Sequence, residues 1–563
     1  VSWTFRKAEK FFDIVTYSSA GTGNSKTVSH NLGQAPGMIL FKEIDGSQEW
    51  VVWHTSQSSK FANLSYTSAF TSATVVSSAS STEFVLASDR TPTNAGGSVG
   101  ARTYIAYLFA NNSDDGGYGP DADLDIIKCG SFATAGSGSS LVGPNLGWEP
   151  QFVILKNATS NSNGSWWIFD SQRGFYSAGY DSNSGKTHYL RADVADQEGN
   201  FNTNTLNVTS TGFTMPSDAF SPGQTFIYMA IRRGPMAEPT AGTQVFSPIS
   251  YTSSDGTWSS SRTLESNFPT DLAIIGYRDA ADGGTGRFVD RTRGYALMLS
   301  AHNTNAEQHN ANAFEDWRQT GTRVTTDEYS KYNAGNGNDY YIFQFRRAPG
   351  FFDIVSYIGN GGTDQTITHN LRAIPQLIIG KRRDAGSTDW PVYYGSGLYN
   401  VFLSSDTNRT GLGAMHKVGA DFNDIDSTTE FAVSVQSGGN ASKSLNTSDA
   451  EYVLYIFGTL AGISKVGIYT GTTNDLNVDC GFSSGARFVM VKAVESSGTD
   501  WYVWNSATGI VSGNDPYVLF NKTDAAVTNT DKIDPINSGF TITSSAGSAL
   551  NANGETYLFL AIA

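Results

Sequence analysis

The acidic side chains near the middle of the sequence are the group that could most readily do chemistry. Two carboxylates held roughly five to ten ångströms apart can hydrolyse a glycosidic bond, one as an acid and the other as a base or nucleophile. The stretch between residues 307 and 328 carries five such side chains, at Glu307, Glu315, Asp316, Asp327 and Glu328. If this protein cleaved a polysaccharide, this stretch would hold the catalytic pair.

The other motifs with catalytic or metal-binding potential are incomplete. Gly96–Gly100 and Gly481–Gly485 match the G-x-S-x-G pattern, but neither lies between a predicted strand and a helix, as a nucleophilic serine requires. His302 and His309 lie seven residues apart, without the zinc-binding H-E-x-x-H pattern. Asp121–Asp125 lacks the glycine and the final glutamate of a calcium loop. We therefore expect no catalytic residue, no metal site and no cofactor.

Composition excludes several other functions. The chain has 563 residues, with 37 Lys and Arg against 52 Asp and Glu, a net charge of −15. The negative charge and the lack of a basic tract argue against nucleic-acid binding. No apolar run is long enough to span a membrane. The two cysteines, Cys129 and Cys480, cannot form a tetrahedral cysteine zinc site, and we expect two separate buried thiols.

An internal repeat organises the whole chain. The segment Phe11–Tyr17 returns as Phe351–Tyr357, and Thr27–Leu32 returns as Thr366–Leu371. Each copy has an Asn or Gly followed eleven residues later by a Lys or Arg. These pairs are Asn31 and Lys42, Asn145 and Lys156, Asn267 and Arg278, Asn370 and Lys381, and Gly481 and Lys492. A period of about 110 residues is the size of a domain, so each copy should own a core.

Two further landmarks predict β-strands in each copy. A short aromatic strand follows the Lys or Arg and ends at Trp53, Phe169, Tyr393 or Trp504, with a degenerate version at Arg287–Asp290. Each copy closes with a continuous apolar strand, such as Tyr104–Phe109, of the kind that is buried on both faces. Helical signal is weak, and the one short helix that we expect is Asn305–Trp317.

We predict an all-β protein of five tandem antiparallel β-sandwich modules, with little helix. The modules are expected at residues 11–113 (module 1), 114–236 (module 2), 237–349 (module 3), 350–461 (module 4) and 462–563 (module 5). Residues 1–10 resemble the joint between modules 3 and 4, so we expect them to be the closing strand of a preceding module, paired with a sheet. The joints are short, which predicts stiff stacking into an extended body.

The histidines, the basic residues and the aromatic residues that recur in the copies could each serve structure or function. His30 and His369 are replaced in the other copies, so they are expected to support turns rather than catalysis. The repeated Lys or Arg should lie along apolar surface with its charge in solvent, with a carboxylate partner in the next loop or, as the alternative, a glycan contact. The repeated aromatic residues should be core residues, because large rings dominate sandwich cores.

A binding residue should occur in one copy and be missing from its siblings. Two aromatic residues meet this criterion, Trp148 in the turn of module 2 and Tyr399 in module 4. They are the candidate ligand-binding residues, since a flat ring can stack on a sugar.

The repeat frame resembles a known family. The pattern F-R-K-A-x-x-F-F-D-I-V-x-Y, followed by S-H-N-L-G-x-x-P-G-M-I-L-F-K and Y-I-A-Y-L-F-A, is similar to a repeat domain of marine bacteriophages. It occurs in large virion proteins of cyanophages and related phages, often labelled tail fibre or virion structural protein, and its role is largely unassigned. The resemblance implies a virion location and carries over no catalytic or binding residue.

The resulting expectation is a non-catalytic, homo-oligomeric virion protein, such as a tail fibre that attaches to the host. Its partners would be other virion proteins, copies of itself and a host-surface glycan. A capsid decoration protein or a lectin-like glycan binder is the alternative. A glycan depolymerase is the least favoured function, and it would need the carboxylates of module 3.

Overall fold

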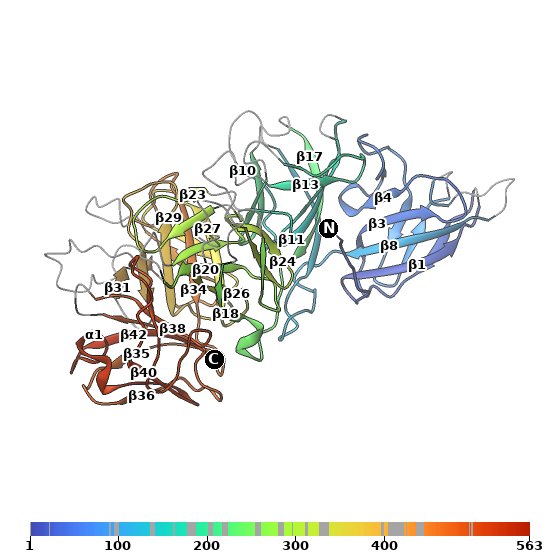
Figure 1. Cartoon of the computed structure of the whole chain (residues 1–563). Helices are drawn as coiled ribbons and strands as arrows, with labels where there is room; N and C mark the ends of the chain where they lie inside the picture. The colour runs from blue at the N-terminus through green and yellow to red at the C-terminus, as the bar shows by residue number, and fades with distance from the viewer. Residues whose placement is uncertain are drawn as a thin grey trace. The chain divides into compact units, whose positions relative to one another are not determined.

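The residues that the structure describes form ten antiparallel β-sheets, two for each of five sandwich modules. Figure 1 shows the strands along the chain. The computed structural model describes residues 2–21, 23–88, 92–94, 101–134, 141–161, 164–176, 187–200, 206–216, 223–253, 261–279, 286–295, 297–309, 314–325, 337–395, 399–402, 422–423, 425–434, 444–494, 496 and 499–563. The predicted all-β class with tandem sandwiches is confirmed.

Every module has the same strand order. The large sheet runs first strand, last strand, third, fourth and fifth, with a sixth strand in modules 2 and 3. The small sheet joins the second strand to the two strands that precede the last one. The continuous apolar closing strand thus lies inside the large sheet, between the first and third strands. Its burial on both faces follows from this central place.

In modules 1 and 2 the strands follow one another across each sheet in this order. Module 1 has β1 (Phe12–Ser18), β8 (Thr103–Ala110), β3 (Pro36–Glu43), β4 (Val51–His54) and β5 (Ala62–Asn63), and β2 (Lys26–Ser29), β7 (Glu83–Leu86) and β6 (Val76–Ala79). Module 2 has β9 (Ile127–Ala133), β17 (Thr225–Arg232), β11 (Pro150–Asn157), β12 (Trp166–Asp170), β13 (His188–Arg191) and β14 (Gly199–Asn200), and β10 (Leu141–Val142), β16 (Gly212–Pro216) and β15 (Asn207–Thr209).

The strands of modules 3, 4 and 5 follow the same scheme. Module 3 has β18 (Phe246–Thr252), β26 (Asp339–Phe345), β20 (Leu272–Tyr277), β21 (Arg287–Asp290), β22 (Leu297–Ser300) and β23 (Gln308–His309), and β19 (Arg262–Glu265), β25 (Gly321–Val324) and β24 (Phe314–Arg318). Module 4 has β27 (Phe352–Ile358), β34 (Glu451–Phe457), β29 (Leu377–Arg382), β30 (Pro391–Tyr394) and β31 (Tyr399–Phe402), and β28 (Gln365–Thr368), β33 (Glu430–Val433) and β32 (Phe422–Asn423). Module 5 has β35 (Ser464–Thr470), β42 (Thr556–Ile562), β37 (Phe488–Ala493), β38 (Tyr502–Asn505) and β39 (Val518–Leu519), and β36 (Leu476–Asp479), β41 (Gly539–Ile542) and β40 (Ile533–Ile536).

Helix is confined to single turns in the part of the chain that the structure describes. These are η1 (Thr55–Gln57), η2 (Gly242–Gln244), η3 (Ser544–Ala546) and α1 (Ser548–Asn551). The helix expected at Asn305–Trp317 is wrong, since this stretch contains β23 and β24. Phe314 and Trp317 pack together at 4.6 Å in the core of module 3, so burial in a sheet outweighs a weak helical preference.

The chain consists of two compact units. Unit 1 contains modules 1 and 2 except residues 176–185, unit 2 contains modules 3 to 5, and the main division falls between Met236 and Ala237. In modules 2 to 5, side chains that point between the two sheets form a separate core. In module 1 these side chains belong to a cluster that also includes residues of module 2. The other face of each large sheet, called here the outer face, carries a second set of apolar side chains, because successive residues of a strand alternate between faces.

The outer faces join modules together. In unit 2 they form one continuous core to which modules 3, 4 and 5 all contribute. Phe345 of module 3 contacts Phe352 of module 4, and Phe343 of module 3 contacts Phe488 of module 5. A linear stack would keep modules 3 and 5 apart, so the expected extended body does not describe unit 2. We call this arrangement the three-module cluster.

Candidate functional site

The repeated lysines of modules 2, 4 and 5 are buried rather than solvated. Lys156 and Lys381 are fully buried and Lys492 is 9% exposed, which overturns the expectation that the charge points into solvent. Burial lowers the pKa of Lys156 to about 8 and that of Lys381 to about 7. Each ammonium group, including that of half-buried Lys42, donates to a backbone carbonyl two residues before a tryptophan. The lysine therefore fastens a loop and is not available to a glycan.

Arg278 does not belong to this set. In modules 1, 2, 4 and 5 the anchor residue lies seven residues before the third-strand residue that pairs with one fixed position of the closing strand. In module 1 this residue is Met38, which pairs with Phe109. In module 3 the equivalent pair is Leu272 with Phe345, and Asn267 lies only five residues before Leu272. The two missing residues shift the register, so Gly276 takes the lysine position and Arg278 falls beyond β20. In place of a lysine amine, the Tyr341 hydroxyl accepts the N–H of Gly286 at 2.9 Å.

The lysines of modules 2 and 4 also bind the preceding module. Lys156 donates to the Thr67 carbonyl of module 1 at 3.1 Å, and Lys381 donates to the Thr304 carbonyl of module 3 at 3.3 Å. The tryptophan beside each lysine does the same. Trp166 Nε1 donates to the Asn63 carbonyl at 3.0 Å, and Trp390 Nε1 donates to the Asn303 carbonyl at 3.2 Å. We call Lys42 and Trp50, Lys156 and Trp166, Lys381 and Trp390, and Lys492 and Trp501 the lysine–tryptophan pairs.

The polar residues at the turn after the second strand serve the backbone. Backbone N–H groups of Asn31 and Asn370 donate to Asp13 and Asp353 at 2.8 and 2.7 Å. The Asn145 side chain accepts from the N–H of Gly147. His30 and His369 are buried, and their Nδ1 atoms accept the N–H groups of Leu32 and Leu371. These contacts support the structural interpretation of the turn.

The repeated aromatic positions lie in the module cores. Trp53, Phe169 and Trp504 are at most 5% exposed, and Tyr393 is half-buried against Phe422.

The structure bears differently on the two candidate ligand-binding residues, Trp148 and Tyr399. Trp148 is 2% exposed and packs in the core of module 2, so its expected binding role is wrong. Its turn folds back onto Leu146 and the β11 layer, a tertiary contact that sequence cannot show. Tyr399 pairs with Tyr394 through the backbone of β31, and its side chain lies outside the described residues.

Glu307 is neutralised by two arginines and cannot act as a general acid or base. Its carboxylate contacts Arg293 at 2.7 Å and Arg383 at 3.0 Å, and all three side chains are at most 1% exposed. Burial opposes ionisation of Glu307, but the arginines outweigh it and hold its pKa below the ordinary value. Asp316 pairs at the surface with Arg318. The Glu315 side chain, Asp327 and Glu328 lie outside the described residues.

The remaining motifs serve structure where they are described. Gly481–Gly485 is a turn between β36 and β37, whereas Gly96–Gly100 lies outside the described residues. Asp125 accepts backbone N–H groups of Asp114 and Gly116. Cys129 and Cys480 are free and buried. Among the described residues no cluster of three metal-ligating side chains occurs, and no helix is long and apolar enough to cross a membrane.

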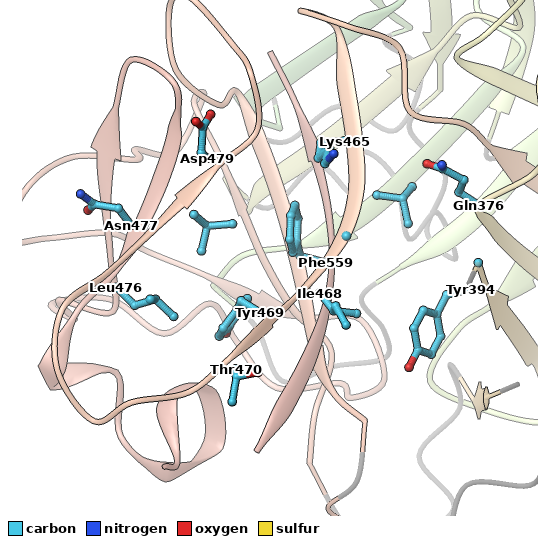
Figure 2. A pocket seen from close by; sticks show the side chains of 14 residues that line it. Gln376, Tyr394, Lys465, Ile468, Tyr469, Thr470, Leu476, Asn477, Asp479 and Phe559 are labelled. Atoms are coloured by element: carbon cyan, nitrogen blue, oxygen red, sulfur yellow. The ribbon is translucent and has the colours of Figure 1, made fainter. Parts of the chain in front are cut away.

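A groove between modules 4 and 5 is the best candidate binding site. Its volume is about 460 Å³, within the range of ordinary ligand pockets. In Figure 2 the side chains of β35 lie between module 4 residues on one side and β36 residues on the other. The lining residues with the most distinctive chemistry are Gln376 and Tyr394 from module 4, Lys465 and Ile468 from β35, and Asn477 and Asp479 from β36.

The groove offers polar groups around an apolar centre. Ile468 is 53% exposed, and the Gln376 Oε1 atom is buried without a hydrogen-bond partner among the described residues. Gly467 leaves room for the Phe559 ring, since a Cβ atom there would lie 2.7 Å from that ring. Sequence reasoning missed this site, because module 4 supplies one wall and the relation between modules is invisible in a single repeat. Gly467 is the one residue within the repeat itself whose type points to the groove.

The buried Lys381 makes the stability of unit 2 depend on pH. Its folded pKa of about 7 lies below the ordinary 10.5, so the unfolded chain binds more protons between these values and stability rises with pH there. We expect the unfolding free energy of wild type minus that of Lys381→Met to increase by up to ~1.4 kcal/mol per pH unit between pH 7 and 10. Urea unfolding at several pH values checks this. Lys522→Met, at a lysine whose side chain is 40% exposed, is the control, and equal slopes for the two variants would contradict the burial argument.

Comparison with known proteins identifies a family but no activity. A search of curated proteins finds no match. Among solved structures, the crystal structure of the LG1-3 region of the laminin alpha2 chain is aligned with 10% identity and a TM-score of 0.08, covering 56% of this chain and 91% of that one. The model of a domain of unknown function, DUF7483, matches residues 6–235 and again residues 346–563. Because these matches cover most of the chain, it belongs to the DUF7483 family.

Proposed function

We propose that this chain is a non-catalytic structural protein of a bacteriophage virion, in an appendage such as a tail fibre that contacts the host surface. The observation that carries the proposal is the use made of the repeat's polar side chains. Lys156, Lys381 and Glu307 all join one module to the next. Side chains that could do chemistry are therefore used to hold the modules rigidly together. The resemblance of the repeat frame to phage virion proteins supports the proposed virion location.

The proposed partners are other virion proteins and further copies of the chain, without nucleic acid or membrane insertion. The net charge of −15 supports the exclusion of nucleic acid. A capsid decoration protein would use the same rigid modules and remains the structural alternative. A depolymerase is disfavoured, since the Glu307 carboxylate is ion-paired on both sides.

Glycan binding is the second candidate function, and the groove between modules 4 and 5 favours it. Amide, carboxylate and ammonium groups surround exposed Ile468, a combination that suits the hydroxyls and apolar faces of a sugar. In this role the groove would bind a saccharide of the host surface reversibly. Several copies on one particle would strengthen weak contacts through avidity.

Labelling and adsorption experiments separate these roles. Antibody against the chain should label intact particles, and phage carrying Lys465→Ala with Asp479→Ala should keep the label but adsorb more slowly. Phage carrying Lys522→Ala, away from the groove, should adsorb normally. Unlabelled particles would refute the virion location, and normal adsorption of the groove variant would refute glycan binding there.

A further inference from the structure

The three-module cluster shows how one module docks on another. The loop after the fifth strand of module 3 covers the outer face of module 4, where Glu307 N–H donates to the Arg383 carbonyl at 2.8 Å. The corresponding loop of module 5 covers module 3, where Ala526 N–H donates to the Arg278 carbonyl at 2.6 Å. Arg383 and Arg278 occupy the same position, two residues after Lys381 and Gly276. The same contact recurs in unit 1.

In unit 1 the loop of module 1 docks on module 2. Phe70 N–H donates to the Ala158 carbonyl, two residues after Lys156, and the Phe70 ring packs on Trp166 at 6.5 Å. The lysine–tryptophan pair of module 2 is thus occupied by module 1, as that of module 4 is occupied by module 3.

The segment before module 1 copies the segment that links module 3 to module 4. Phe5 lies 5.5 Å from Phe12 and 6.2 Å from Phe152 of module 2. Phe345 lies 5.6 Å from Phe352 and 6.2 Å from Phe488 of module 5, and these are the equivalent residues of modules 4 and 5. The two segments therefore make equivalent contacts with both of the modules that follow them.

Further contacts extend the match. Trp3 packs on Phe152 at 5.9 Å, as Phe343 packs on Phe488 at 5.3 Å. Lys7 donates to the Ile14 carbonyl, as Arg347 donates to that of Ile354. The matches to the family model also begin at equivalent residues, 6 and 346. Modules 1 and 2 therefore correspond to modules 4 and 5, and module 3 has no counterpart among the described residues of unit 1.

Residues 2–7 form no strand in the described structure, so the expected sheet pairing of residues 1–10 is not found. In unit 2 the equivalent Phe343 and Phe345 pair with β18 and β20 of module 3. Among the described residues of unit 1, nothing takes the place that β18 and β20 have beside Phe343 and Phe345.

The outer face of module 1 is left partly open as a result. Trp50 and Tyr107, whose rings lie 5.8 Å apart, are half-buried, and Ile44 is 55% exposed. The equivalent residues in module 4 are Trp390, Tyr455 and Arg383, and module 3 buries all of them. Half-exposed aromatic rings on one sheet face are typical of a protein–protein contact.

We propose that modules 1 and 2, together with residues Trp3–Ala8, bind a third sandwich module of this same repeat, joined to this segment as module 3 is joined to module 4. Its loop after the fifth strand places backbone carbonyls against Lys42 Nζ and Trp50 Nε1. Because Ile44 stands where module 4 has Arg383, the incoming loop carries an apolar residue, like Phe70, and not a glutamate. Unit 1 then completes a second three-module cluster.

A tandem duplication supplies this module. A chain in which residues 6–109 occur twice has Phe109 of the first copy in place of Phe5, and Trp50→Phe in the first copy makes the second Trp50 traceable. Hydroxyl-radical footprinting read by mass spectrometry should show Trp50 oxidised several-fold more slowly than in the parent chain. Unchanged oxidation of Trp50 in a folded duplicated chain overturns the proposal.

The parent chain provides an independent check that does not depend on the duplication folding. Trp50 and Tyr107 should be oxidised faster than buried Trp166 while the chain sediments as a monomer. Equal protection of Trp50 and Trp166 in the monomer would mean that no open face exists. A dimer that Ile44→Asp dissociates would identify a second copy as the occupant. Either result refutes the proposal.

Discussion

Replacing Arg293 by Met should destabilise unit 2 by about 3–5 kcal/mol, the usual cost of breaking a buried ion pair. Arg293 is fully buried and contacts Asp290 at 2.5 Å, Glu307 at 2.7 Å and the Tyr455 hydroxyl at 3.0 Å. The network crosses from module 3 to module 4, so the variant leaves two carboxylates short of a counter-charge inside an intermodule contact. Urea unfolding, followed by hydrogen exchange in peptides of modules 3 and 4, measures the loss.

The matched control is Arg318→Met, which removes an ion pair from the surface of module 3. Arg318 and Asp316 are 38% and 42% exposed, so the loss should stay below about 1 kcal/mol. Equal losses for Arg293→Met and Arg318→Met would mean that the buried network does not hold modules 3 and 4 together.

Truncating Trp504 to Ala should cost module 5 on the order of 3–5 kcal/mol, through lost burial and the cavity left behind. The ring is fully buried and packs between Tyr502 and Tyr517, with centroids at 5.9 and 5.6 Å. Hydrogen exchange of module 5 peptides in urea reports the change for this module alone.

Ile468→Ala is the control for Trp504→Ala, because it removes an apolar side chain that is 53% exposed in the same module. Its effect should be about 0.5 kcal/mol or less, as for most surface changes. If the two variants were equally stable, the repeated aromatic would not be a core residue of module 5.

Sequence reasoning reaches the fold through periodicity. Short apolar strands separated by turn residues predicted five sandwiches, and the strand order is the same in all five modules. Repetition also placed the lysines of modules 1, 2, 4 and 5 in register. It failed at Arg278, because counting residues from Asn267 cannot reveal a two-residue deletion in the loop before β20.

The relation between modules was beyond sequence reasoning. Lys156 and Lys381 look like solvated strand ends until a neighbouring module covers them, and Trp148 looks exposed because its turn is polar. The groove was missed for the same reason, since Gln376 and Lys465 belong to different modules. The core of a single module can be predicted from the alternation of apolar and polar residues along its strands. Contacts with other modules leave only one trace in the sequence, which is apolar residues on the second face of the large sheet.

A cryo-EM reconstruction of the intact phage particle tests the central claim most directly. If the chain is a non-catalytic structural protein of the virion, the map should contain its β-sandwich modules in an external appendage, with modules 3, 4 and 5 around their common core. A particle without these modules, together with a purified chain whose cleavage of a host polysaccharide is lost on one carboxylate substitution, would contradict the claim.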